Sequence, residues 1–126
     1  MRVLLDTVTF IFAITSPDLL SKRAMELLKD EETVVELSAI SLSEIAIKRS
    51  LGKLDLNQEQ AATGLSDFRA QVLPYTVLHA YRLFDLPLHH RDPFDRQIIA
   101  QALVEDIPIV TSDKIFRRYR GLKVIW

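Results

Sequence analysis

Hydrophobic and polar residues follow one another along this chain in blocks that predict alternating strands and helices. Residues 3–5 form a short apolar run without alternation that ends at Asp6, as is typical of a strand buried on both faces. Similar short runs predict strands at 33–37, 72–75, 108–111 and 123–125. Apolar residues at helical spacing predict helices over 16–28, 41–52, 58–71, 77–84 and 93–104, with a short helix beginning at Asp113.

Several of these boundaries carry local signals. Ser16 followed by Pro17 suits the start of a helix, with serine as the N-cap and proline in the first turn. Gly52 suits the left-handed residue that commonly follows a helix. Pro74 cannot donate a hydrogen bond to a neighbouring strand, so the segment 72–75 is expected at a sheet edge or a strand end.

The alternation of strands and helices predicts the fold class. It implies a mainly parallel sheet with helices on both faces, which is a three-layer α/β/α sandwich with right-handed crossovers. A chain of 126 residues has the length of one domain, so a single domain is expected over residues 1–126.

Composition and charge narrow the range of functions. A net charge of −1 gives no overall basic field of the kind that marks many nucleic-acid binders. A local basic patch is nevertheless expected near the C-terminal end, formed by Lys114, Arg117, Arg118, Arg120 and Lys123. The lack of cysteine excludes disulfides and thiolate metal sites and suits a reducing compartment. With no signal peptide and no apolar span of membrane length, the protein is expected in the cytoplasm, with no membrane partner.

Four acidic residues fall where an α/β sheet places its sites. Asp6 directly follows the first predicted strand, and Asp113 follows the strand at 108–111. Glu44 and Asp95 lie in the predicted first turns of helices. Because sites in open α/β sheets form beyond the carboxyl ends of the strands, these four carboxylates are expected to meet at one edge.

Carboxylates that meet in this way require a counter-charge. Two unit charges about 4 Å apart repel by about 4 kcal/mol at an effective dielectric constant of about 20. Mg²⁺ or Mn²⁺ prefers oxygen ligands and keeps bound water that can become a nucleophile. Such a site suits metal-assisted hydrolysis of a phosphodiester bond.

Each acid also has a purely structural alternative. Ser41 and Glu44 fit a capping box, and Asp92 fits an N-cap with Asp95 three residues later. Asp113 could cap the helix that follows it. Asp6 has no clear capping role unless a helix begins directly after it.

The sequence gives little support for other types of catalytic or binding site. The adjacent His89 and His90 cannot share a helical face, and His79 lies on another predicted helix, so all three are expected to be surface or loop residues rather than metal ligands. No serine has a partner at a spacing that would activate it as a nucleophile. With three glycines in the chain, no Gly-rich phosphate loop is present.

Four sequence segments resemble one known family. "LLDT", "SLSEIAIKRSLGKLDL", "LPLHHRDPFDRQIIAQAL" and "IVTSD" are similar, in order and spacing, to the PIN-domain family, and specifically to the VapC-like ribonuclease toxins of type II toxin–antitoxin systems. The resemblance covers essentially the whole chain. It implies a PIN fold, a Mg²⁺- or Mn²⁺-dependent endoribonuclease acting on RNA, a cognate antitoxin that blocks the site, and frequent homodimerisation.

The resemblance also implies roles for particular residues. Asp6, Glu44, Asp95 and Asp113 match the four acids of the family, with Asp6 and Asp95 as principal metal ligands and the other two completing the pocket directly or through water. Asp95 matches the third acid because the small residues Ala100 and Ala102 follow it, whereas Asp92 is a cap that could also touch the metal network. Thr7 and Thr111 would orient carboxylates or water.

Two departures from the family pattern concern the rim of this pocket. Val8 and Thr9 stand where such proteins often carry His-Ala, and Ser43 stands where they often carry Trp, so the rim that meets substrate or antitoxin is expected to differ from theirs.

Two other functions fit parts of the sequence. A phosphoacceptor receiver domain has similar length and alternation but needs paired acids after the first strand and a central acceptor Asp, neither of which is present. A PIN-like binding module without catalysis is the other alternative.

Overall fold

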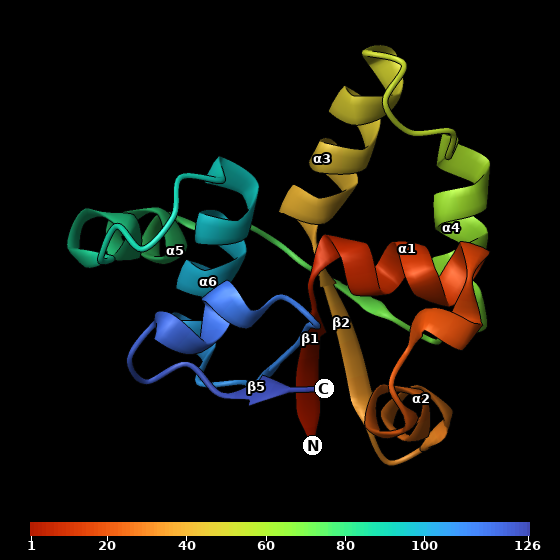
Figure 1. Cartoon of the computed structure of the whole chain (residues 1–126), viewed down its shortest axis with the longest axis horizontal. Coiled ribbons are helices and arrows are strands. Elements are labelled where there is room, and N and C mark those ends of the chain that lie inside the picture. Colours follow the sequence, from red (N-terminus) through yellow and green to blue (C-terminus); the bar gives the residue numbers. More distant parts are fainter.

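The computed structural model describes all 126 residues as an α/β fold (Figure 1). Its five strands are short: β1 (Arg2–Leu5), β2 (Val34–Ser38), β3 (Gln71–Leu73), β4 (Ile109–Val110) and β5 (Val124–Ile125). Its α-helices are α1 (Thr7–Thr15), α2 (Lys22–Lys29), α3 (Ala39–Ser50), α4 (Gln58–Asp67), α5 (Val77–Arg82) and α6 (Pro93–Glu105). Its short 3₁₀ helices are η1 (Pro17–Leu19), η2 (Leu83–Asp85) and η3 (Lys114–Arg118).

The strands form one parallel sheet in the order β3-β2-β1-β4-β5. Leu5 of β1 pairs with Leu37 of β2 and with Val110 of β4, so these three strands end at nearly the same level. In the sheet, β2 lies on one side of β1, whereas β4, followed by β5, lies on the other side. The strand order therefore reverses between β1 and β4, which is where ligands bind in doubly wound sheets.

Helices cover both faces of the sheet, as the sequence predicted. Val3 and Leu5 of β1 contribute to one hydrophobic core with residues of α1 and α2, whereas Leu4 contributes to a second core with residues of α6 and η3. Figure 1 shows α1, α2 and α4 on one side of the strands and α5, α6 and η3 on the other. A strand covered on both faces needs apolar residues at every position, which explains the uninterrupted run at residues 3–5.

One helix was missed by the prediction. α1 starts directly after β1, and the Asp6 side chain caps it by accepting a hydrogen bond from the Thr9 backbone N–H at 2.9 Å. A helix therefore does begin directly after Asp6, so the capping alternative that the sequence left open applies to this acid. Its sequence, TVTFIFAIT, is rich in β-branched residues and apolar on most sides, so it carries neither helix propensity nor amphipathic spacing.

Two helix starts also differ from the prediction. The helix expected over 16–28 is divided into η1 and α2, because Ser21 provides a new N-cap by accepting from the Ala24 N–H. α3 begins at Ala39 with Ser38 as its N-cap, so the capping box predicted on Ser41 is wrong.

The remaining boundaries lie close to those predicted. Gly52 has the expected left-handed conformation, with φ of 70°. α4 ends at Asp67 rather than Gln71, and β3 lies at the edge of the sheet, before Pro74. No helix has the length and apolar character needed to cross a membrane.

Candidate active site

The acidic residues gather beyond the carboxyl ends of β1, β2 and β4. Asp6 directly follows β1, and its backbone N–H donates to the Val110 carbonyl at 3.2 Å, which ties it to β4. Thr111 directly follows β4, and Asp113 comes two residues later. Because β1 and β4 are the strands between which the order reverses, these residues lie at the switch point of the sheet.

Asp6 is held rigidly at the centre of this edge. Its side chain is buried, with Oδ1 accepting from the Thr9 N–H at 2.9 Å and Oδ2 accepting from the Thr111 hydroxyl at 2.6 Å. Burial raises the pKa of Asp6 above its ordinary value, the hydrogen bonds from Thr111 and Thr9 oppose the rise, and the charge of Asp113 adds to it. Thr111 thus occupies the position expected of a residue that orients a carboxylate.

Glu44 is buried on α3 beside one counter-charge. Because α3 begins at Ala39, Glu44 lies in the second turn of the helix rather than the predicted first turn. Lys48, one turn later, donates to Glu44 Oε2 at 2.6 Å, and this hydrogen bond raises the pKa of Lys48. Glu44 Oε1 is buried and has no hydrogen-bond partner. An unpartnered buried carboxylate oxygen is costly, so this atom is available to a cation or to water.

The first of the two acids at the start of α6, Asp92, is the N-cap that the sequence predicted. Asp92 caps the helix by accepting from the N–H groups of Phe94 at 2.9 Å and Asp95 at 3.1 Å. The Asp95 side chain is 17% exposed and makes no capping hydrogen bond. Its pKa is raised from 3.8 to about 8, first by burial and then by the negative charges of Asp92, Asp6, Glu44 and Asp113. The five acids therefore share one electrostatic neighbourhood.

Asp113 lies at the exposed rim of this neighbourhood. Its side chain caps η3 by accepting from the Ile115 N–H at 3.1 Å, as the structural alternative predicted. Its own N–H donates to the Thr111 hydroxyl at 3.0 Å, so Thr111 links Asp113 to Asp6. The Thr7 hydroxyl, in contrast, donates to Ser41 at 2.9 Å and joins α1 to α3 instead of contacting a carboxylate.

One of the three histidines is placed differently from the prediction. His79 is buried, not a surface residue: its Nε2 lies 3.1 Å from Glu105, and its Nδ1 accepts from the Thr76 N–H at 3.0 Å. His90 lies in the loop before α6, with Nε2 3.2 Å from Asp95 Oδ2. His90 is the site neighbour that sequence reasoning missed, because nothing in a His-His pair indicates which ring turns inward.

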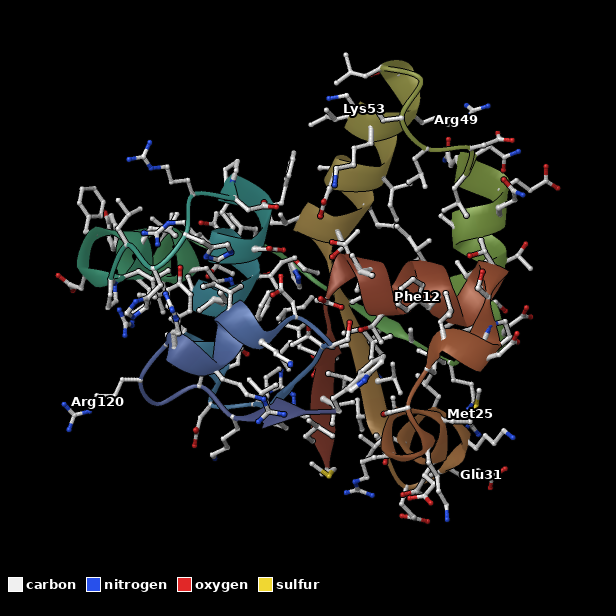
Figure 2. The ribbon with its side chains drawn as sticks, viewed as in Figure 1. Phe12, Met25, Glu31, Arg49, Lys53 and Arg120 are labelled. Carbon is white, nitrogen blue, oxygen red and sulfur yellow. The ribbon has the colours of Figure 1, made fainter.

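The predicted C-terminal basic residues are exposed on η3 and the loop after it. One of them, Lys123, pairs with Asp106 at 3.3 Å. Figure 2 shows Arg120 extending into solvent away from the body of the protein. Lys114, Arg117 and Arg118 on η3 directly follow Asp113, so they are the members of the group nearest to the acids along the chain.

The acids offer carboxylate oxygens as ligands for a divalent cation, but they do not form a complete coordination shell by themselves. No three Asp, Glu or His side chains approach closely enough in this structure to hold a metal ion together. Mg²⁺ is commonly held by one or two carboxylates, with water and substrate phosphate supplying the other ligands, so three converged side chains are not required. The raised pKa of Asp95 and the unpartnered Glu44 Oε1 fit a cation bound among these acids.

Solved structures with a similar fold come from bacterial protein complexes. A VapBC2 structure from Rickettsia felis bound to a promoter DNA fragment is 20% identical, covers 99% of this chain and 98% of that chain, and has a TM-score of 0.74. DNA-bound VapBC from Salmonella typhimurium is 21% identical over 99% and 97%, with a TM-score of 0.72. A toxin–antitoxin complex from Klebsiella pneumoniae is 18% identical over 98% and 96%, with a TM-score of 0.67.

Sequence comparison assigns the family directly. No curated protein sequence matches this chain. The family model described as "PIN domain" matches residues 3–122, which include all four candidate acids. The strand order 3-2-1-4-5 also differs from the 2-1-3-4-5 order of receiver-type sheets, so the receiver-domain alternative is wrong. The chain belongs to the PIN-domain family.

Proposed function

We propose that this protein is a Mg²⁺- or Mn²⁺-dependent endoribonuclease and the toxin of a toxin–antitoxin pair. The observation that carries the proposal is the buried Glu44 Oε1, which has no hydrogen-bond partner and lies among acids whose charges, together with burial, raise the pKa of Asp95 to about 8. Carboxylates crowded to this extent destabilise a fold unless something compensates for their charge. A divalent cation removes that cost and brings hydrolytic chemistry to the same place.

The bound ion would supply an activated water and stabilisation of the charge on the scissile phosphate. Asp6 and Asp95 would be its principal ligands, and Glu44 Oε1 and Asp113 would complete the acidic pocket. The Thr9 N–H and the Thr111 hydroxyl hold the Asp6 carboxylate in one orientation. The raised pKa of Asp95 favours its protonated form in the metal-free protein, so binding of a cation there would displace that proton.

The chain also carries groups suited to an RNA substrate. Lys114, Arg117 and Arg118 are exposed on η3, next to Asp113. Such side chains bind phosphates without reading sequence, so they would hold the RNA backbone beside the acids and leave its specificity to other contacts. We expect the protein to act in the cytoplasm, consistent with its lack of cysteine.

The partner we infer is a cognate antitoxin, because the similar solved structures include VapBC and toxin–antitoxin complexes. We place this partner in a groove of about 870 Å³ between α3 and α4. Its apolar lining includes Leu42, Ile45, Leu54 and Leu65, which fits the apolar face of a partner helix. An Ala62→Lys substitution at this lining should weaken inhibition by the antitoxin while cleavage by the free toxin persists.

A homodimer is the second assembly we infer. Five large apolar side chains are between 61% and 86% exposed around α5 and η2: Val77, Leu78, Tyr81, Phe84 and Leu88. A patch of this kind on a small protein commonly marks an interface. Light scattering after size-exclusion chromatography should give twice the monomer mass for the wild type and the monomer mass for Phe84→Asp.

The enzymatic proposal is tested by incubating the purified protein with RNA in Mg²⁺, in Mn²⁺ and in EDTA. Cleavage should require a metal and should be lost in Asp95→Asn. Asp85→Asn serves as the matched control, because Asp85 is exposed and makes no ion pair or side-chain hydrogen bond. Cleavage that persists in EDTA, or full activity of a folded Asp95→Asn variant, would refute the proposal. Metal binding with no cleavage of any RNA would indicate a catalytically silent PIN-like binding module.

A further inference from the structure

Three side chains form a hydrogen-bonded chain that ends on Asp95. Arg96 Nη1 donates to the Tyr119 hydroxyl oxygen at 3.1 Å, and that oxygen lies 2.7 Å from His90 Nδ1. The other ring nitrogen of His90, Nε2, lies 3.2 Å from Asp95 Oδ2. Tyr119 is 1% exposed, and the His90 side chain is 18% exposed. The contacts therefore lie largely out of solvent, where hydrogen bonds strongly orient their partners.

The direction of these hydrogen bonds follows from their first member. A guanidinium can only donate, so the Tyr119 oxygen accepts from Arg96. Its own proton is then free to be donated to His90 Nδ1, and a neutral imidazole that accepts at Nδ1 carries its proton on Nε2. This N–H points at Asp95 Oδ2. In this arrangement every member of the chain has a partner, and the opposite tautomer would leave the Tyr119 proton without an acceptor.

Arg96 also fixes the loop that carries His90. Besides Tyr119, its guanidinium donates to the Pro87 carbonyl at 2.7 Å and to the Leu86 carbonyl at 3.2 Å. Arg96 immediately follows Asp95 on α6, so one helical turn presents the acid and anchors the loop that carries its hydrogen-bond donor. The position of His90 relative to Asp95 is thereby set by three hydrogen bonds from a single side chain.

From this geometry we propose that His90 is a positioning residue for Asp95, held in its Nε2–H tautomer by Tyr119 and Arg96. The inference rests on the metal-dependent function proposed above. With Oδ2 held by His90, Asp95 Oδ1 has no hydrogen-bond partner in the protein and is the oxygen presented to a cation. Hydrogen-bonded partners of metal-binding carboxylates limit their rotation, and loss of such a partner typically weakens metal affinity or activity about 10–100-fold.

His89 provides a matched control for this role. It is the adjacent residue, it is exposed, and its ring packs edge-on against Tyr119 with centroids 4.8 Å apart. It makes no side-chain hydrogen bond. If His90 contributed only aromatic packing against Tyr119, substitutions of His89 and His90 would have similar effects.

The first test measures Mn²⁺ affinity by calorimetry and RNA cleavage by kcat and KM, on full-length variants checked for folding. His90→Leu should weaken Mn²⁺ binding and lower kcat by about 10–100-fold, with KM for RNA little changed. His90→Gln keeps an N–H donor near the position of Nε2 and should restore most of both. His89→Leu should behave as the wild type. Equal Mn²⁺ affinity in His90→Leu and the wild type would overturn the proposal.

The second test reads the tautomer directly in the metal-free wild type. Long-range ¹H–¹⁵N correlation spectra near pH 9, where Asp95 is mostly ionised, should show His90 protonated on Nε2 and unprotonated on Nδ1. Tyr119→Phe should weaken this preference and lower Mn²⁺ affinity. An Nδ1–H tautomer in the wild type would overturn the proposal even if His90→Leu fails to fold.

The two proposals fail in distinguishable ways. If the wild type binds Mn²⁺ but cleaves no RNA, the endoribonuclease proposal fails, and Mn²⁺ affinity and the tautomer still decide the role of His90. If the wild type cleaves RNA and His90→Leu cleaves equally well, only the positioning role fails. A wild type that binds no Mn²⁺ overturns both.

Discussion

Replacement of Asp95 by asparagine should stabilise the metal-free protein, and increasingly so as the pH rises. Between about pH 4 and pH 8 the folded protein retains a proton on Asp95 that the unfolded chain has released, because the pKa is 3.8 in the unfolded reference and about 8 in the fold. The folded state then binds more protons than the unfolded state. Its stability therefore falls as the pH rises through this window, and asparagine removes that dependence.

The size of the effect follows from the pKa of Asp95. A rise from 3.8 to about 8 corresponds to at most about 6 kcal/mol of lost stability once the group is ionised in the fold. The side chain is 17% exposed, so water and small rearrangements reduce this value. Asparagine also forfeits about 0.3–1 kcal/mol of favourable interaction between a carboxylate and the N-terminus of α6. We expect a net gain of about 2–4 kcal/mol near pH 9 and almost none near pH 4.

Urea denaturation in EDTA at several pH values measures this gain. Asp6 also has a raised pKa, but it is present in both proteins, so the difference between wild type and variant isolates Asp95. Asp85→Asn should follow the wild-type pH dependence. Parallel stability curves for wild type and Asp95→Asn between pH 5 and 8, or a less stable variant near pH 9, would show that the acids are not crowded as the structure implies. Mg²⁺ should stabilise the wild type and leave Asp95→Asn nearly unchanged.

Three further outcomes can be measured. Asp6→Asn should abolish cleavage while its melting temperature stays near that of the wild type, because asparagine caps a helix as well as aspartate. Asp6→Ala should have a free energy of unfolding about 1 kcal/mol lower than Asp6→Asn, and equal melting of the two variants would contradict the capping role. Lys48→Met should lower the free energy of unfolding, measured in denaturant, by about 1–3 kcal/mol, because the buried Glu44 loses its hydrogen-bonded partner. Adding Glu44→Gln to the same chain should recover most of that loss. Gly64→Ala should lower stability by about 1–3 kcal/mol, since its Cβ would lie 2.5 Å from Ile14 Cδ1; an unchanged melting temperature would show that Ile14 moves aside freely.

Much of the site could be predicted because its acids stand next to local signals. Asp6 and Asp113 flank short apolar runs that become β1 and β4, and Asp92 is followed by the proline that marks the first turn of α6. These patterns span a few residues and hold in almost any surrounding. The parallel sheet then follows from the alternation of elements, and the position of the acids at one edge follows from the sheet.

Other features depended on partners that are distant in the chain. α1 has weak helical signals of its own, yet it forms because it packs Phe10 and Ala13 into the core and is capped by Asp6. The burial of His79 depends on Glu105, which is 26 residues away. No pattern within a short window contains these contacts.

From the amino-acid sequence alone, the α/β class, the alternation of strands and helices apart from α1, and the candidate acids could be predicted, because hydrophobic spacing and capping are local properties. The tertiary structure decided which atoms of those acids are free. Thr111 reaches Asp6 across 105 residues, and Tyr119 reaches His90 across 29, so the orientation of each carboxylate is set by residues that only folding brings together.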